Sequence, residues 1–204
     1  MESIQLESGA TPSPERRGLL RWVAGAAGLS SLEARPAGRP GTPSPPSFPN
    51  LPVLTHEGRT VRFYDDLVRG RTVVFNMMYT VCSGICPAST ATLLQVQQAL
   101  APRLGRDVFM YSMTLQPQFD DPRALSDYMR RYGVRPGWTF LTGKPQDMDV
   151  LRRALGFFDS DPALDGDLRT HTGMVRAGND ALNRWLMVST FTSPQRIVRA
   201  LQRL

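Results

Sequence analysis

Residues 72–87 read Thr72-Val-Val-Phe-Asn-Met-Met-Tyr-Thr-Val-Cys82-Ser-Gly-Ile-Cys86-Pro87. The first eight residues form a nearly continuous apolar run of strand length, which is typical of a strand buried on both faces of a sheet. Pro87 suits the first turn of a following helix, because a missing N–H costs nothing there. The stretch therefore predicts a strand, a short connection that carries two cysteines, and a helix.

Strand and helix signals alternate on both sides of this stretch. Their order predicts an α/β domain with a thioredoxin-like central mixed sheet flanked by helices, because a cysteine pair lies between the first long strand and its helix. A turn at residues 177–180 is expected to join the last two strands. The expected strands are 53–55, 60–63, 72–79, 108–113, 138–141, 174–175 and 185–188, and the expected helices are 88–104, 121–132, 145–155 and 192–204.

The composition changes near residue 50. Nine of the 17 prolines fall within residues 1–52, and such proline-rich sequence does not sustain helix or sheet hydrogen bonds. Arg16 and Arg17 precede a short, weakly apolar stretch, which resembles a twin-arginine export signal. We therefore expect residues 1–50 to be a signal and a linker, and residues 51–204 to be one domain in a bacterial periplasm, membrane-tethered if the signal is uncleaved.

The overall composition argues against several other classes of protein. The apolar fraction of 41% and the charged fraction of 21% are those of a globular chain. The chain has no run of 18 or more apolar residues, so the sequence predicts no membrane-spanning helix. The net charge of +6 comes from scattered basic residues without interleaved aromatic residues, so we expect no nucleic-acid partner and at most a position near a membrane.

Cys82 and Cys86 are the only cysteines in the chain. A spacing of four residues would place them on one face of a helical turn, close enough for a disulfide or a shared metal ion. We also expect the helix amino terminus to favour the thiolate form, which attacks disulfides and binds metals. Two thiolates suit Cu(I), and a third ligand would also permit Cu(II).

The chain has two histidines that could supply this third ligand. His171 stands at the end of a polar loop that can fold back over the helix amino terminus, so it is the candidate ligand, with a structural hydrogen-bonding role as the alternative. His56 falls in a hairpin turn, where we expect a solvated side chain. Met174 follows His171 closely and is a further candidate. The other strand methionines are expected to fill the core: Met77, Met78, Met110 and Met113.

The pattern Tyr79-Thr80-x-Cys82-x-x-x-Cys86-Pro87 is accompanied by Ser112, Asp121-Pro122 and one distant histidine. Together these residues resemble the Sco/SenC family, whose members are thioredoxin-fold copper-binding proteins of the periplasm and the mitochondrial inner membrane. The resemblance covers about residues 50–204. It implies that the two cysteines and His171 hold one copper ion, and that the protein assists copper-site assembly of cytochrome c oxidase or a related oxidase.

The implied partners are the copper-site subunit of a terminal oxidase, or another copper protein, and a thiol reductant. A metallochaperone of this kind is not formally an enzyme. The chain departs from the family pattern at Ser83, where members usually have Pro, and at residues 113–115, which lack the usual Asp. A second hypothesis is therefore a periplasmic thiol-disulfide oxidoreductase, with Cys82 as the attacking thiolate and Cys86 as the resolving thiol. A peroxidase-like use of Cys82 is the third, and an inert domain with a purely structural disulfide is the remaining alternative.

Overall fold

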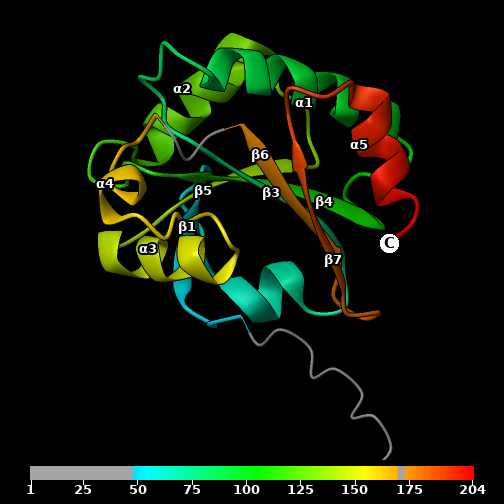
Figure 1. The fold of residues 1–204 in the computed structure, drawn as a ribbon, viewed down its shortest axis with the longest axis horizontal. Helices are drawn as coiled ribbons and strands as arrows, with labels where there is room; N and C mark the ends of the chain where they lie inside the picture. Colours follow the sequence, from blue (N-terminus) through cyan, green and yellow to red (C-terminus); the bar gives the residue numbers. More distant parts are fainter. Residues whose placement is uncertain (1–47, 170–172) are drawn as a thin grey trace, which may run out of the picture. The chain divides into compact units, whose positions relative to one another are not determined.

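The computed structural model describes residues 48–169 and 173–204, which form a mixed sheet with helices on both faces (Figure 1). The strand order is β2-β1-β5-β4-β3-β6-β7. The central strands β5, β4 and β3 are parallel, and the outer pairs are antiparallel. This arrangement confirms the predicted thioredoxin-like mixed sheet. The strands are β1 (Pro52–Thr55), β2 (Thr60–Arg62), β3 (Thr72–Met78), β4 (Val108–Thr114), β5 (Trp138–Thr142), β6 (Met174–Asn179) and β7 (Arg184–Ser189).

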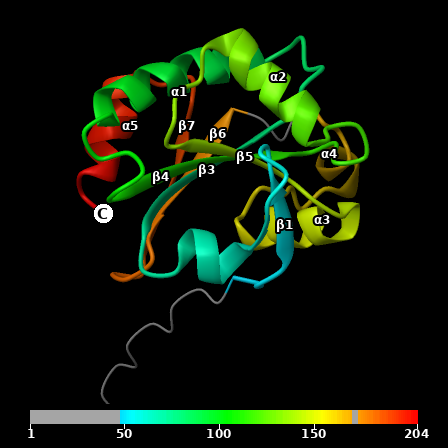
Figure 2. The same cartoon turned by 180° about the vertical axis from the view of Figure 1, so that it is seen from behind.

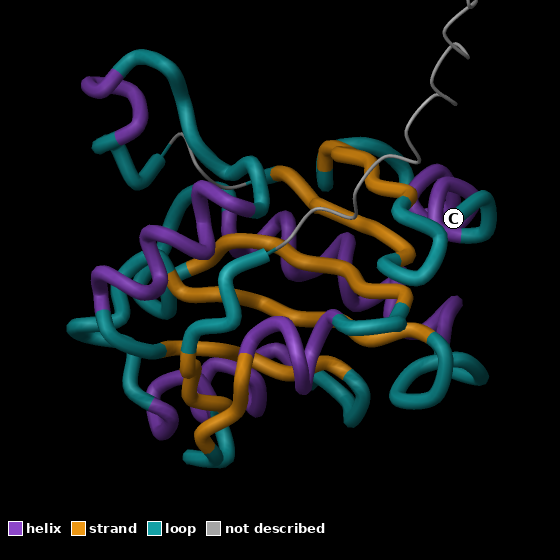
Figure 3. Tube along the Cα trace, turned by 90° about the horizontal axis from the view of Figure 1, so that it is seen from below, coloured by secondary structure: helices purple, strands orange, loops and turns teal. Residues whose placement is uncertain are grey.

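Helices α1, α2 and α5 cover one face of the sheet, and η1 and α3 cover the other (Figures 1 and 2). Figure 3, seen from below, shows the strands side by side between these layers. Within the described residues, no helix has the length and apolarity needed to cross a membrane. The helices are η1 (Phe63–Val68, a π-helix), α1 (Cys86–Leu100), α2 (Pro122–Tyr132), α3 (Pro145–Ala154), α4 (Pro162–Asp165) and α5 (Pro194–Leu201).

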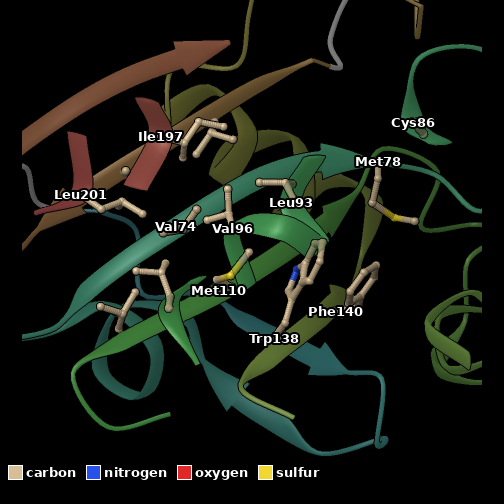
Figure 4. Packing of buried hydrophobic residues seen from close by; sticks show 14 of the residues in the cluster. Val74, Met78, Cys86, Leu93, Val96, Met110, Trp138, Phe140, Ile197 and Leu201 are labelled. Carbon is tan, nitrogen blue, oxygen red and sulfur yellow. The ribbon is translucent and has the colours of Figure 1, made fainter. Parts of the chain in front are cut away.

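Two apolar cores fill the space between the sheet and its helices. Successive side chains of a strand point to opposite faces, so β3 sends Val74 and Met78 toward α1 and sends Phe75 and Met77 toward η1 and α3. Figure 4 shows residues of the first core, including Met78 and Cys86. The four strand methionines are at most 2% exposed, as predicted. The sheet that carries the cysteine segment is therefore held on both faces.

The turn between the last two strands lies further along the chain than predicted. Strand β6 continues through Gly178, and the chain reverses after Asn179, with Asn183 in the left-handed region at a φ of 48°. The ring of Trp185 covers Gly178 so closely that a Cβ there would lie 2.0 Å from its Cε3 atom. Gly178 is thus required for packing across the hairpin, and the turn expected at residues 177–180 was wrong.

A buried ion-pair cluster fastens the segment after α3. The Arg152 guanidinium donates to Asp165, with its Nη1 2.7 Å from Oδ1, and to the Phe157 carbonyl oxygen at 2.6 Å. It also donates to Asp149, one turn earlier in α3. The Arg152 and Asp165 side chains are only 9% and 7% exposed. This cluster therefore fixes residues 157–165 against α3.

Replacing Arg152 by Met is expected to lower the free energy of unfolding by about 3 kcal/mol, because the buried Asp165 carboxylate loses its main counter-charge. Urea unfolding followed by circular dichroism measures the change. Arg130→Met is the matched control, because the Arg130–Asp127 pair is exposed and such pairs contribute less than about 1 kcal/mol. Equal effects of the two substitutions would contradict this account.

Candidate thiol and metal site

The cysteine segment begins where β3 ends at the carboxyl edge of the parallel strands. Cys82 lies in a turn that is closed by its own N–H, which donates to the Tyr79 carbonyl oxygen at 3.2 Å. Cys86 is the first residue of α1, and Pro87 follows in the first turn. The two residues therefore do not share a helical turn as expected: the chain between them curves back to bring Cys82 to the start of the helix. Both are free thiols.

Burial and hydrogen bonding give the two thiols different acidities. Burial alone would raise the pKa of Cys82, but hydrogen bonds from Cys86 and Tyr79 and from nearby backbone N–H groups outweigh it and lower that pKa below its ordinary value. Cys86 is 1% exposed, and burial together with its hydrogen bond to Cys82 raises its pKa to about 12. The expectation that the helix terminus favours thiolate therefore fails for Cys86, because desolvation is the larger effect.

Tyr79 completes this small network from the end of β3. Its hydroxyl hydrogen-bonds to the Cys82 sulfur, and this bond, with burial, raises the pKa of Tyr79 to about 12. A neutral phenol at this position donates to the sulfur without competing for its negative charge. The arrangement favours a single negative charge on the thiol pair, located on Cys82.

A buried carboxylate holds the segment that leads to Cys82. Asp120, with 0% exposure, accepts hydrogen bonds from the Thr80 N–H at 3.1 Å, from the Thr80 hydroxyl and from the Thr114 hydroxyl. Thr80 follows β3, Thr114 ends β4, and Asp120 precedes α2. One side chain thus joins three segments at the edge of the sheet where the thiols lie.

Asp120 is a site residue that was not predicted from the sequence. Residues 113–115 lack the usual Asp, but the hydroxyl of Thr114 reaches the Asp120 carboxylate six residues later. The available signal was the doublet Asp120-Asp121 before Pro122, since a helix N-cap accounts for only one carboxylate. Asp121 is that cap and accepts from the Ala124 N–H.

The first turn of α1 is also tied to β7. The Ser89 hydroxyl in α1 and the Thr190 hydroxyl after β7 lie 2.8 Å apart and share a hydrogen bond. The Thr190 N–H donates to the Gly173 carbonyl oxygen, also at 2.8 Å. A chain of two hydrogen bonds therefore joins the start of the cysteine-bearing helix to Gly173, the residue just before β6.

Of the two histidines, the structure describes only His56. His171 lies outside the described residues. His56 is half-buried, and its Nδ1 accepts from the Phe140 N–H at 3.3 Å, so it is not the solvated side chain that the sequence suggested. Burial lowers the pKa of His56. Among residues 48–169 and 173–204, no three or more His, Cys, Asp or Glu side chains cluster closely enough to hold a metal ion.

A mixed sheet with a buried dithiol between a central parallel strand and its helix defines a thioredoxin-like thiol protein. The profile of the SCO1/SenC family matches residues 52–204, so the chain belongs to that family. The SCO1 protein homolog of Bacillus subtilis (strain 168) is 30% identical over 80 residues. This alignment covers 39% of the chain and 41% of the relative, less than half of either protein.

Solved structures share the fold at low identity. A SCO1/SenC family lipoprotein from Bacillus anthracis str. Ames is 20% identical, with a TM-score of 0.61 over 76% of this chain and 92% of that one. Bradyrhizobium japonicum ScoI, solved with copper bound, is 20% identical, with a TM-score of 0.57 over 74% and 95%. BsSco, described as a cytochrome c oxidase assembly protein with a disulfide switch, is 18% identical, with a TM-score of 0.60 over 76% and 92%.

In the reduced protein, iodoacetamide is expected to alkylate Cys82 well before Cys86. The Cys82 thiolate forms below its ordinary pKa of 9.0, whereas Cys86 stays protonated until the pH approaches 12, and only thiolate reacts. Peptide mass spectrometry after timed labelling between about pH 6 and pH 10 measures both rates. Preferential labelling of Cys86 anywhere in this range would contradict the assigned acidities.

Asp120→Ala is expected to lower stability by about 2–4 kcal/mol, because the buried Thr114 hydroxyl and the part-buried donors of Thr80 lose their acceptor. The same change should accelerate alkylation of Cys82, because the turn before it loses its attachment. Asp121→Ala is the control, since losing an N-cap costs about 1 kcal/mol and leaves that turn intact. An unchanged labelling rate in Asp120→Ala would show that the carboxylate does not hold the cysteine segment.

Proposed function

We propose that this chain is a copper chaperone that holds one copper ion through Cys82, Cys86 and His171. The observation that carries the proposal is the hydrogen-bonded thiol pair at the carboxyl edge of the sheet, where ligands of open α/β sheets bind. Thiolates are soft ligands that favour Cu(I). A copper ion would also displace the proton that Cys86 retains because of its high pKa, since a metal deprotonates a coordinating thiol.

His171 is proposed as the third ligand, and residues on both sides of it support this role. Gly173, two residues later, is linked through Thr190 to Ser89 in the first turn of α1. Before it, Asp167 lies close enough to Tyr79 to raise the pKa of the phenol. Residues on both sides of positions 170–172 thus interact with the surroundings of the thiols. An imidazole with two thiolates would permit Cu(II) as well as Cu(I).

The proposed clients are the copper-site subunit of cytochrome c oxidase, or another copper protein, with a thiol reductant as a further partner. The copper-bound and oxidase-assembly relatives support this proposal. Residues 1–50 are proposed as an export signal and linker that deliver residues 51–204 to the periplasm. The lipoprotein among the structural relatives supports an exported, membrane-associated domain.

The unequal acidities favour a second candidate, a thiol-disulfide reductase. The Cys82 thiolate would attack one sulfur of a client disulfide, forming a mixed disulfide and releasing a client thiolate. Cys86, after losing its proton, would attack Cys82 and release the second client thiolate. The client gains two electrons, the protein becomes a Cys82–Cys86 disulfide, and an external thiol reductant must restore it.

Copper binding decides between the two candidates. The reduced full chain is expected to bind one copper ion and, as Cu(II), to show a thiolate-to-copper charge-transfer band. Cys82→Ser and Cys86→Ser should abolish stoichiometric binding, and His171→Ala should abolish the band. Atomic absorption with visible spectroscopy makes both measurements.

His56→Ala is the matched control because it removes the only other imidazole. It should leave the copper content and the charge-transfer band unchanged. Stoichiometric copper in a Cys82→Ser/Cys86→Ser double variant would refute the chaperone proposal. No copper in the wild type, together with faster reduction of a client disulfide than by free dithiothreitol, would establish the reductase.

A further inference from the structure

Exposed apolar side chains gather at the sheet edge that carries the thiols. Within the described residues, eight large apolar side chains are exposed. Four of them follow or begin strands at this one edge: Val81 after β3, Phe119 after β4, Met174 at the start of β6 and Phe191 after β7. Because β4, β3, β6 and β7 are consecutive in the sheet, these side chains lie along one edge. We call them the apolar rim.

The rim is fixed to the same groups that position the cysteines. Val81 stands between Thr80 and Cys82, and Phe119 precedes Asp120, so the hydrogen bonds between Thr80 and Asp120 hold Val81 and Phe119 on adjoining turns. Val81 is 74% exposed and Phe119 is 69% exposed. Exposed apolar side chains on a hydrogen-bonded framework mark an interaction surface more strongly than the same residues on a loose loop.

The other half of the rim lies on the far side of the thiols. Phe191 is 63% exposed, and its ring rests on Gly173, where an added Cβ would lie 2.7 Å from the ring. Met174 is the next residue and is also exposed. Strand β3, which leads to Cys82, lies between β4 and β6. The rim therefore flanks the cysteine segment on both sides, whereas Cys82 is only 8% exposed.

The charged groups next to Tyr79 offer little to attract a charged partner. Asp167 and Arg169 are the ionic groups that act on Tyr79, and they pair with each other at 2.7 Å. Asp121, beside Asp120, is engaged as the cap of α2. An apolar contact area around a recessed reactive group suits a protein partner that excludes water from the point of exchange.

We propose that the apolar rim docks the copper-accepting protein, which presents a protruding metal-ligand loop surrounded by apolar side chains of its own. This inference rests on the proposed function and names how the client is recognised. The loop would contact the rim and approach the recessed Cys82 sulfur. Recognition is apolar, so the affinity should depend only weakly on salt.

The test compares full-length wild-type protein, Val81→Ser/Phe119→Ser and Phe191→Ser. The probe is the soluble copper-site domain of the same organism's cytochrome c oxidase, with its thiols reduced. Isothermal titration calorimetry with copper-loaded protein gives the Kd, and atomic absorption gives the copper content. Leu182→Ser is the matched control, because Leu182 is 56% exposed in the β6–β7 turn at the opposite edge of the sheet.

Each rim variant is expected to keep its copper and to bind the acceptor domain at least about tenfold more weakly, as for loss of apolar anchors in an interface. Leu182→Ser should bind as the wild type does. The wild-type Kd should change less than about threefold between about 50 mM and 500 mM NaCl. Unchanged Kd values in both rim variants, or a Kd governed by salt, would overturn the proposal.

Two further results separate the rim from its alternatives. If the wild type binds no copper, the proposed function fails, and the same titration with the copper-free dithiol protein still compares the rim variants with Leu182→Ser. If the rim variants bind the acceptor normally but lose binding to phosphatidylcholine vesicles that the wild type binds, the rim is a membrane contact and the proposal is overturned.

Discussion

The site depends on the buried Asp120 carboxylate, which accepts hydrogen bonds from three donors. Without it, the chain leaving β3 would have no fixed path at Thr80, and Cys82 would not be returned to the start of α1. The same carboxylate binds Thr114 at the end of β4. A carboxyl group with no exposure is stable only when such donors satisfy its oxygen atoms. The site is therefore built into the ends of the central strands.

Burial and reactivity oppose each other at the thiol pair. The core that covers Cys86 keeps it protonated, whereas hydrogen bonds allow Cys82 to lose its proton first. This division suits stepwise chemistry, in which one sulfur reacts and the other follows once its proton has left. Copper binding and disulfide formation both need the second deprotonation. The fold thus makes Cys82 the reactive sulfur and keeps Cys86 buried and protonated until a later step.

Much of the fold could be predicted from local patterns, and the misses depended on contacts between distant residues. The buried run of β3 and the Asp121 and Gly133 boundaries of α2 follow from sequence alone. The Thr80–Asp120 contact joins residues forty positions apart, and no periodicity reports it. Gly178 suggested a turn because glycine is typical of turns. Its actual role, packing against Trp185, cannot be read from the sequence. The cysteine positions were predicted, but their unequal acidities required the burial pattern. The ligand role of His171 stays a prediction.

Copper K-edge X-ray absorption of the reduced full chain, loaded with one equivalent of Cu(I), is the decisive experiment on the copper site. It reports the ligand atoms themselves rather than the effect of a substitution. Two sulfur scatterers and one imidazole are expected in the first coordination shell, with the imidazole lost in His171→Ala and retained in His56→Ala. A shell of nitrogen and oxygen atoms without sulfur would contradict this expectation.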